Sequence, residues 1–192
     1  MVQNTTDVTE ERNGHRYPNP YLEGERIITL LAQLRNILTG RLCILGVGNR
    51  MRGDDGVGSL LVDRLSGRIS VDCVDAGSTP ENFLEKIVKL APDTVLIVDA
   101  VDFGGRHGEI RIFNPQDIVN GGISTHALSL QMAGEYLQER IPVSVFLIGV
   151  QPQATGFGQE LSGVVAKAVD SLAAILLDLC KSEMEISARV RE

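Results

Sequence analysis

The segment LCILGVGNRMRGDDGVGSLLVDRL, residues 42–65, decides the fold that the sequence predicts. Residues 42–48 form a short apolar run that ends in glycines, which is typical of a buried strand entering a loop. Residues 56–65 place Leu60 and Leu61 on one face of a helix together with Leu65. A strand, a glycine-rich loop and a helix in this order indicate the beginning of an α/β sheet.

The same alternation continues along the rest of the chain. The expected strands lie at residues 69–77, 94–100, 108–114 and 143–150, and the expected helices lie at residues 80–90, 126–138 and 160–180. This order predicts an α/β three-layer sandwich, in which a mostly parallel five-stranded sheet has helices on both faces. The strand at 94–100 is almost entirely apolar, so we expect it at the centre of the sheet. The short GGRHG link before residues 108–114 leaves no room for a crossover helix, and that strand is therefore expected to run antiparallel to its neighbour.

The chain divides into four regions around this one domain. Residues 1–23 are polar and are expected to form a flexible arm. Residues 24–40 carry apolar side chains at spacings of three and four, which predicts an amphipathic helical extension that packs through its apolar face. Residues 41–182 hold the α/β domain, and residues 183–192 form a charged tail.

The composition argues against several classes of partner. The 192 residues include 18 Lys and Arg against 25 Asp and Glu, and this net charge of -7 disfavours nucleic-acid binding, which needs a basic surface. No apolar stretch approaches the roughly 20 residues that span a bilayer, and the N-terminus lacks the apolar core of a secretory signal. Cys43, Cys73 and Cys180 are widely spaced and odd in number, so we expect reduced thiols and a cytoplasmic protein. We also expect no insertion into a membrane, and a monomer.

Two acids and a histidine are expected at one edge of this sheet, because ligands of open α/β sheets bind at the carboxyl ends of the parallel strands. Asp55 and Asp99 follow two of these strands, and His126 precedes a helix. Two carboxylates and an imidazole suit a divalent ion such as nickel, zinc, iron or manganese. Each residue also has a structural interpretation: Asp55 as a helix N-cap, Asp99 as a paired carboxylate at the sheet end, and His126 at a helix start capped by Ser124 or Thr125. On the residues alone both interpretations stay open.

Two other kinds of site fit the sequence less well. Gly46 and Gly48 begin like a dinucleotide-binding fingerprint, but its third glycine would fall on Met51. Asp54 and Asp55 in the same loop would repel a pyrophosphate. No G-x-S-x-G elbow surrounds a serine, and no cysteine lies at the sheet edge near a histidine, so a serine or cysteine nucleophile has no support.

Six motifs follow one another along the chain and carry a resemblance. They are GVGNRMRGDDGVG (46–58), VDAGSTPEN (74–82), LIVDAVDFG (96–104), GEIRIF (108–113), STHALSL (124–130) and FLIGVQP (146–152). In this order they resemble the [NiFe]-hydrogenase maturation endopeptidases. The sequence is most similar to the branch that serves membrane-bound, formate-hydrogenlyase-type and coenzyme-linked hydrogenases, in which G-D-D-G replaces a D-E-G form. The resemblance covers about residues 42–180 and gives no role to the first 40 residues.

The resemblance implies an endopeptidase that removes the C-terminal extension of a [NiFe]-hydrogenase large-subunit precursor after nickel insertion. In the family an acid in the first loop, an aspartate after the third strand and a histidine before the next helix bind nickel. These positions correspond here to Asp55, Asp99 and His126, with Asp55 in place of a glutamate found in other branches. The nickel arrives with the precursor, on its cysteine thiolates, so the free protein is expected to bind nickel weakly.

The catalytic step and the supporting residues stay open at this point. Nickel would polarise the scissile carbonyl or activate a water, or Asp55 or Asp99 would act as a general base toward water. Asn49, Asp54 and Asp75 are candidates for orienting the nickel ligands or gripping the substrate. Two alternatives from other classes are a non-proteolytic metal-binding chaperone on the same scaffold and a nucleotide-binding α/β domain.

Overall fold

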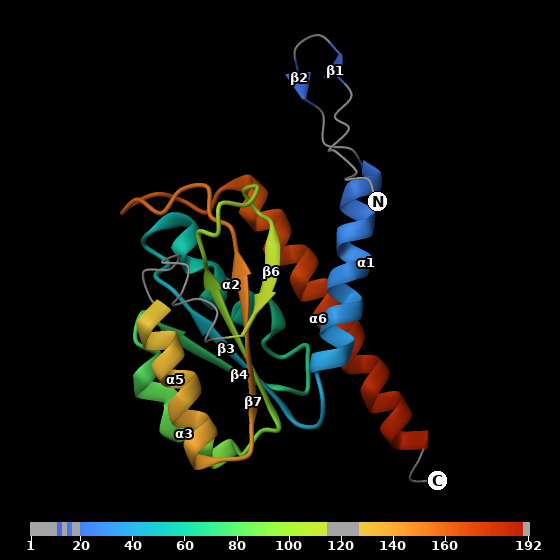
Figure 1. Cartoon of the computed structure of the whole chain (residues 1–192), viewed down its shortest axis with the longest axis vertical. Helices are drawn as coiled ribbons and strands as arrows, with labels where there is room; N and C mark the ends of the chain where they lie inside the picture. The colour runs from blue at the N-terminus through green and yellow to red at the C-terminus, as the bar shows by residue number, and fades with distance from the viewer. Residues whose placement is uncertain (1–10, 13–14, 17–19, 115–126, 190–192) are drawn as a thin grey trace, which may run out of the picture.

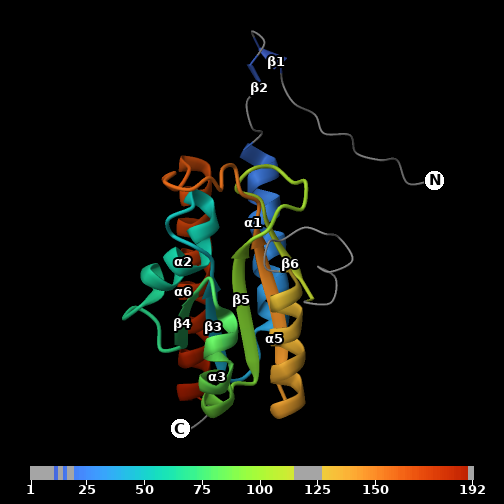
Figure 2. The same cartoon turned by 90° about the vertical axis from the view of Figure 1, so that its left-hand side faces the viewer.

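A five-stranded sheet forms the middle layer of the protein (Figures 1 and 2). The computed structural model describes residues 11–12, 15–16, 20–114 and 127–189. In chain order the strands of the sheet are β3 (Leu42–Val47), β4 (Asp72–Gly77), β5 (Thr94–Ala100), β6 (Ile110–Phe113) and β7 (Ser144–Val150). In space their order is β4-β3-β5-β7-β6.

The predicted sheet is confirmed in its main features. The strands β4, β3, β5 and β7 are parallel, and β6 runs antiparallel to β7. β5 lies in the middle and is buried along its whole length. Its apolar sequence is therefore explained by burial on both faces.

Helices cover both faces of the sheet. One face carries α1 (Pro20–Ile37), α2 (Val57–Leu65) and α6 (Gly163–Arg189), and the other carries α3 (Leu84–Leu90) and α5 (Ala127–Arg140). Two short 3-10 turns, η1 (Gly53–Gly56) and η2 (Pro80–Phe83), lead into α2 and α3. The two-residue strands β1 (Glu11–Arg12) and β2 (His15–Arg16) pair with each other, apart from the main sheet.

Each central strand contributes to two hydrophobic cores. In β3, Ile44 packs in the core beneath α1, α2 and α6, whereas Cys43 and Leu45 pack in the core beneath α3 and α5. In β5, Leu96 and Ile97 divide between the two cores in the same way. This alternation follows from the pleat of a strand, which points successive side chains to opposite faces.

Two helices extend well beyond their predicted bounds. α1 begins at Pro20 rather than at Gly24, because proline suits the first turn of a helix, where its missing N–H is not needed. α6 continues to Arg189 instead of ending near residue 180, because residues 181–189 contain mostly good helix formers and neither glycine nor proline. In the described part of the chain, no helix has both the length and the apolar character needed to cross a membrane.

The predicted packing of the N-terminal helix is confirmed for its second half. Leu30, Leu34 and Leu38 are buried in the core shared with α2 and α6. Ile27 and Ile28, one to two turns earlier, are 44% and 67% exposed. The predicted apolar face of α1 is therefore buried only in the second half of the helix, where it packs in the core.

The strand order creates a switch point between β3 and β5. β4 lies on one side of β3, and the chain then returns to place β5 on its other side. The carboxyl ends of β3 and β5 lie at this switch point, which is the usual position of a ligand site in such a sheet.

Candidate active site

Asp55 and Asp99 both lie at this switch point. Asp99 is the penultimate residue of β5 and follows Val98, whose register partner in β3 is Gly46. Asp55 lies in η1, which contacts β5. The exposed fractions of the two residues are only 7% for Asp55 and 0% for Asp99. Because a buried carboxylate needs a partner, these two residues are the first candidates for chemistry.

A backbone N–H holds one oxygen of each of these carboxylates. The N–H of Asn49 donates to Oδ2 of Asp55 over 3.1 Å, and the N–H of Ala100 donates to Oδ1 of Asp99 over 2.8 Å. The interpretation of Asp55 as a helix N-cap is wrong, because the residue before α2 is Gly56 and makes no side-chain cap. The Asp55 side chain instead ties η1 back to the start of its own loop.

Two glycines let this loop pack tightly against the end of β5. Gly48 has a φ of +127°, and a Cβ atom there would lie 1.7 Å from the carbonyl oxygen of Asp55. A Cβ atom at Gly58 would lie 2.2 Å from the carbonyl oxygen of Val98. Only glycine fits such approaches of backbone to backbone. The loop with Asp55 is thus pressed against the residue that precedes Asp99.

Asp54, the neighbour of Asp55, faces a different part of the chain. Its fully buried carboxylate accepts hydrogen bonds of 2.7–3.0 Å from the N–H groups of Gln153, Ala154 and Ser162 and from the Ser162 hydroxyl. Two backbone hydrogen bonds join the same two segments. Asp54 therefore fastens η1 to residues 151–162, the loop between β7 and α6, which we call the 151–162 loop.

Asp75, in β4, anchors the other side of the Asp55 loop. Its carboxylate accepts hydrogen bonds from the Ser59 hydroxyl at 2.6 Å and from the Arg50 guanidinium at 2.8 Å. Arg50 also pairs with Asp63 in α2. Burial raises the pKa of Asp75, but the hydrogen bonds from Ser59 and Arg50 outweigh it and bring the pKa below its ordinary value. The ionised carboxylate thereby holds Arg50, and with it the loop, in one position.

The backbone N–H groups of this loop are largely engaged within the protein. The donors are Gly48, Asn49, Met51, Arg52, Gly53, Asp54 and Asp55. A phosphate-binding loop instead offers such N–H groups to its ligand. The geometry therefore gives no support to the nucleotide-binding alternative.

His126 lies outside the described residues, which resume at Ala127, the first residue of α5. Within the ranges that the structure describes, no three His, Cys, Asp or Glu side chains are gathered as a metal site requires. The joint metal site of Asp55, Asp99 and His126 therefore stays a prediction.

Gln151 forms a second polar arrangement at the same edge; it lies in the motif FLIGVQP (146–152), but its role was not predicted. It follows β7 directly and is 5% exposed. Its side-chain oxygen accepts the N–H groups of Phe103 and Gly105, and its side-chain nitrogen donates to Oδ1 of Asp102 over 2.9 Å. The amide thus joins the end of β7 to the loop between β5 and β6. The sequence signals for Gln151 were its place in that motif and its position directly after an apolar strand, and neither indicates which groups the side chain binds.

Comparisons with known proteins identify the family of this chain. A family model described as hydrogenase maturation protease matches residues 57–179. The chain belongs to this family. The hydrogenase 3 maturation protease of Escherichia coli K12 is 39% identical over 132 residues, which are 67% of this chain and 84% of that protein.

Solved structures of hydrogenase maturation proteases have the same fold. The HycI protease from Thermococcus kodakarensis KOD1 superimposes with a TM-score of 0.72 at 34% identity and covers 78% of this chain and 99% of its own. The HycI endopeptidase from Escherichia coli gives a TM-score of 0.63 at 34% identity, with 70% and 87% covered. The family match begins at Val57, later than the boundary of residue 42 that the motifs indicate, and so does not include Asp55.

Proposed function

We propose that this protease is an endopeptidase that removes the C-terminal extension of a [NiFe]-hydrogenase large-subunit precursor after nickel insertion. The observation that carries the proposal is the pair of buried carboxylates, Asp55 and Asp99, at the switch point of a chain that belongs to the hydrogenase maturation proteases. The names of the relatives from Escherichia coli and Thermococcus kodakarensis support the same activity.

Nickel is part of the substrate in this proposal and serves as the recognition element. Asp55 and Asp99 offer it carboxylate oxygens, and His126 offers an imidazole nitrogen, a combination that suits nickel. The backbone N–H groups of Asn49 and Ala100 fix one oxygen of each carboxylate, which limits how far the two side chains turn. Three such ligands are an incomplete set, so tight binding requires the thiolates of the precursor.

Two catalytic routes are compatible with this arrangement. When the protease and the precursor both bind the nickel, the scissile bond is held beside the site. This lowers the entropic part of the activation barrier for hydrolysis. Asp55 or Asp99 then accepts a proton from the water that attacks the scissile carbonyl, or the nickel of the substrate polarises that carbonyl.

The remaining site candidates act through position. Asn49 orients Asp55 through its N–H, and Asp75 holds the loop through Arg50. Asp54 holds the 151–162 loop rather than a ligand. We also propose that the protease acts as a monomer in the cytoplasm. Cys43, Cys73 and Cys180 form no disulfide, which fits that compartment.

Cleavage distinguishes a protease from a metal-binding chaperone on the same scaffold. The purified protein is incubated with the nickel-loaded precursor and, in parallel, with the nickel-free precursor, and the intact masses of both are followed. The proposal predicts that only the nickel-loaded precursor becomes shorter, at its C-terminus. Nickel binding without any shortening would instead support the chaperone.

A further inference from the structure

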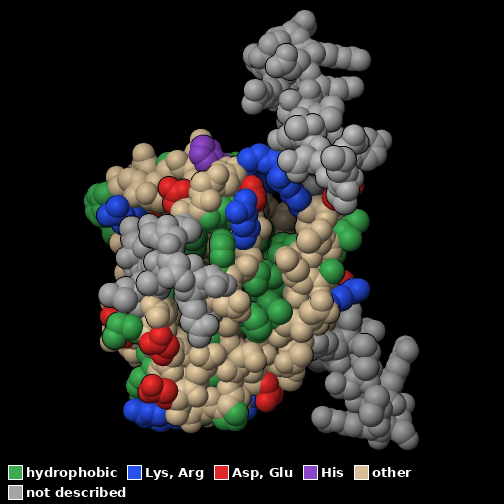
Figure 3. Space-filling view, viewed as in Figure 1, with side chains coloured by type: hydrophobic (Ala, Val, Ile, Leu, Met, Phe, Trp, Pro, Cys, Tyr) green, Lys and Arg blue, Asp and Glu red, His purple; other side chains and the backbone are tan. Residues whose placement is uncertain are grey.

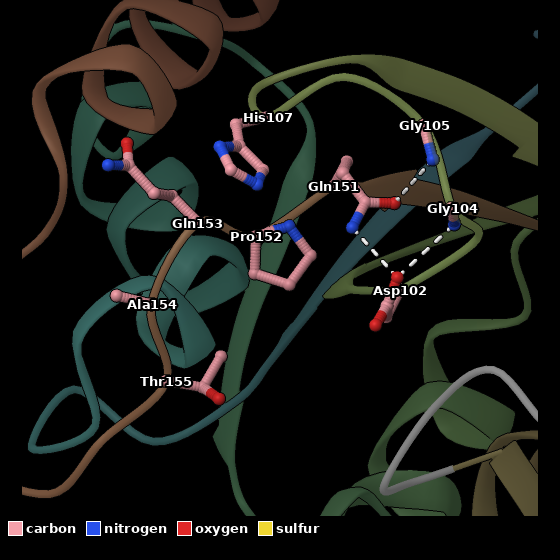
Figure 4. A pocket seen from close by; sticks show the side chains of 9 residues that line it. All are labelled: Asp102, Gly104, Gly105, His107, Gln151, Pro152, Gln153, Ala154 and Thr155. Carbon is pink, nitrogen blue, oxygen red and sulfur yellow. Dashed lines mark hydrogen bonds between the residues drawn. The ribbon is translucent and has the colours of Figure 1, made fainter.

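A polar pocket of about 390 Å³ opens at the same edge of the sheet (Figure 4). It lies between the loop that follows β5 and the first residues of the 151–162 loop. Asp102, His107, Gln151 and Thr155 contribute polar side chains to its lining. Figure 3 shows that acidic, basic and histidine side chains gather at this end of the molecule, whereas hydrophobic side chains lie below it, between β6 and α1.

Both walls of the pocket are held by buried groups. The Gln151 amide binds the backbone of Phe103 and Gly105, which fixes the wall that comes from the β5–β6 loop. Asp54 binds the N–H groups of Gln153 and Ala154, which fixes the opposite wall. A pocket whose walls are fixed in advance loses little entropy when it binds a ligand.

Asp102 presents a fixed negative charge to this pocket. Its Oδ1 accepts hydrogen bonds from Gln151 and from the N–H of Gly104, and Figure 4 shows the second oxygen pointing away from both donors. The Gln151 hydrogen bond, followed by that of Gly104, lowers the pKa of Asp102 below its ordinary value. His107, which lines the same pocket, is the basic side chain whose charge also lowers the pKa of Asp102, whereas Arg111 pairs with Glu109.

The pocket is within reach of anything bound at Asp99. Two residues, Ala100 and Val101, separate Asp99 from Asp102, so their Cα atoms are at most about 11 Å apart along an extended backbone. An extended peptide held near Asp99 spans the same distance with about three of its own residues. A carboxylate at that distance recognises a cationic side chain, and the planar guanidinium of arginine fits it especially well.

We propose that this pocket binds a segment of the precursor and that Asp102 receives a lysine or arginine side chain of that segment. The inference rests on the proposed function and adds a recognition element that does not involve nickel. It assigns Asp102 to substrate binding rather than to the reacting atoms.

The test is the variant Asp102→Asn. Its side-chain oxygen still accepts the hydrogen bonds of Gln151 and Gly104, so the variant removes the charge and leaves the loop in place. With the nickel-loaded precursor we expect KM to rise about tenfold, the usual effect of losing a charge-assisted hydrogen bond, and kcat to stay nearly constant. Glu139→Gln is the matched control, because it removes an exposed carboxylate at the far end of α5 and should leave KM unchanged.

A second set of substrates identifies the partner side chain. Each Lys and Arg in the C-terminal segment of the precursor is replaced by Gln in turn. One replacement should raise KM for the wild-type protease but cause no further rise for Asp102→Asn, because the two changes remove the same interaction.

The outcomes separate this inference from the proposed function. An unchanged KM for Asp102→Asn, or a fall in kcat alone, would overturn the subsite while leaving the protease activity established. Additive effects for every precursor replacement would do the same. A wild-type protein that neither binds nor cleaves the precursor would overturn the proposed function, and the subsite with it.

Discussion

Asp99 is the residue whose substitution tests the site most sharply. The variant Asp99→Asn keeps the volume of the side chain and an oxygen for the N–H of Ala100, but it removes the charge that would hold a cation. We expect cleavage of nickel-loaded precursor to fall by about two to four orders of magnitude with little change in thermal stability. Mass spectrometry and thermal unfolding measure the two quantities. If Asp99→Asn cleaved at the wild-type rate, Asp99 would be neither a nickel ligand nor the general base. These roles would then have to be assigned to Asp55 or Asp75.

Cys43 predicts how stability depends on alkaline pH. Burial, followed by the nearby charge of Asp72, raises the pKa of the Cys43 thiol to about 12 from an unfolded value of 9.0. The folded protein therefore holds this proton more tightly than the unfolded chain does. The resulting stability is fully present below pH 9 and is lost as the pH rises toward about 12.

As the pH rises from about 9 toward 12, the free energy of unfolding should fall less for Cys43→Ala than for the wild type, because the variant lacks this thiol. At neutral pH it should be less stable by about 1 kcal/mol, because it leaves a small cavity in the core. Urea unfolding at several pH values between 7 and 10.5 measures both effects. Parallel pH profiles for the two proteins would contradict the prediction.

The roles of neighbouring residues are what the sequence predicts least well. Asp54 and Asp55 stand in one motif, yet one binds the 151–162 loop and the other binds the start of its own loop. The local sequence does not distinguish the two residues. Their different hydrogen-bond partners arise from the backbone turn of η1 and from a loop almost a hundred residues away. The role of Gln151 likewise depends on a distant segment, because its amide binds the loop between β5 and β6.

At the scale of elements, Asp54 joins two loops that are distant in sequence. In the wild type, both oxygens of Asp54 accept hydrogen bonds. In Asp54→Asn an amide NH2 group replaces one of these oxygens and cannot accept from the N–H donors that face it, so we expect a loss of about 2–4 kcal/mol in the free energy of unfolding. Hydrogen exchange should become faster in the 151–162 loop. The matched control Asp170→Asn removes an exposed carboxylate that pairs with Arg64, and it should change stability by no more than about 0.5 kcal/mol. Equal effects of the two variants would show that Asp54 does not hold the 151–162 loop.

The contact of α2 with the sheet depends on Gly58. In Gly58→Ala the new methyl group would collide with backbone atoms of Val47 and Val98, which cannot move without breaking the sheet. We expect a loss of at least about 3 kcal/mol or failure to fold, as for other overpacked positions. Gly163→Ala is the control, since no atom lies within 4 Å of its Cβ position. Circular dichroism during heating measures both, and similar melting temperatures would show that α2 does not approach the sheet so closely.

The elements themselves were largely predictable. β3, β5 and β7 are buried on both faces, so each is an apolar run in the sequence that ends within a few residues of the strand. The ends of α1 and α6 were not predictable in the same way. In both helices the local preference for helix continues beyond the residues that pack on the sheet.

At the scale of the whole molecule, the N-terminal region should divide into a dispensable part and a structural part. Deleting residues 1–19 should leave cleavage and stability unchanged, because it removes a mostly polar segment that precedes α1. Deleting residues 1–40 removes Leu30, Leu34 and Leu38 from the core and should cost several kcal/mol. Urea unfolding and the cleavage assay measure these variants. Loss of activity in the shorter deletion, with unchanged unfolding, would assign substrate recognition to the arm.

The central claim is that the protease adds its own oxygen and nitrogen ligands to the nickel of the precursor. The most direct measurement is X-ray absorption at the nickel edge, on nickel-loaded precursor alone and on its complex frozen immediately after mixing. We expect additional oxygen and nitrogen neighbours of nickel in the wild-type complex and fewer of them with Asp99→Asn. If nickel had the same coordinating atoms in the precursor alone and in the wild-type complex, the proposal that the protease supplies ligands to this nickel would be wrong.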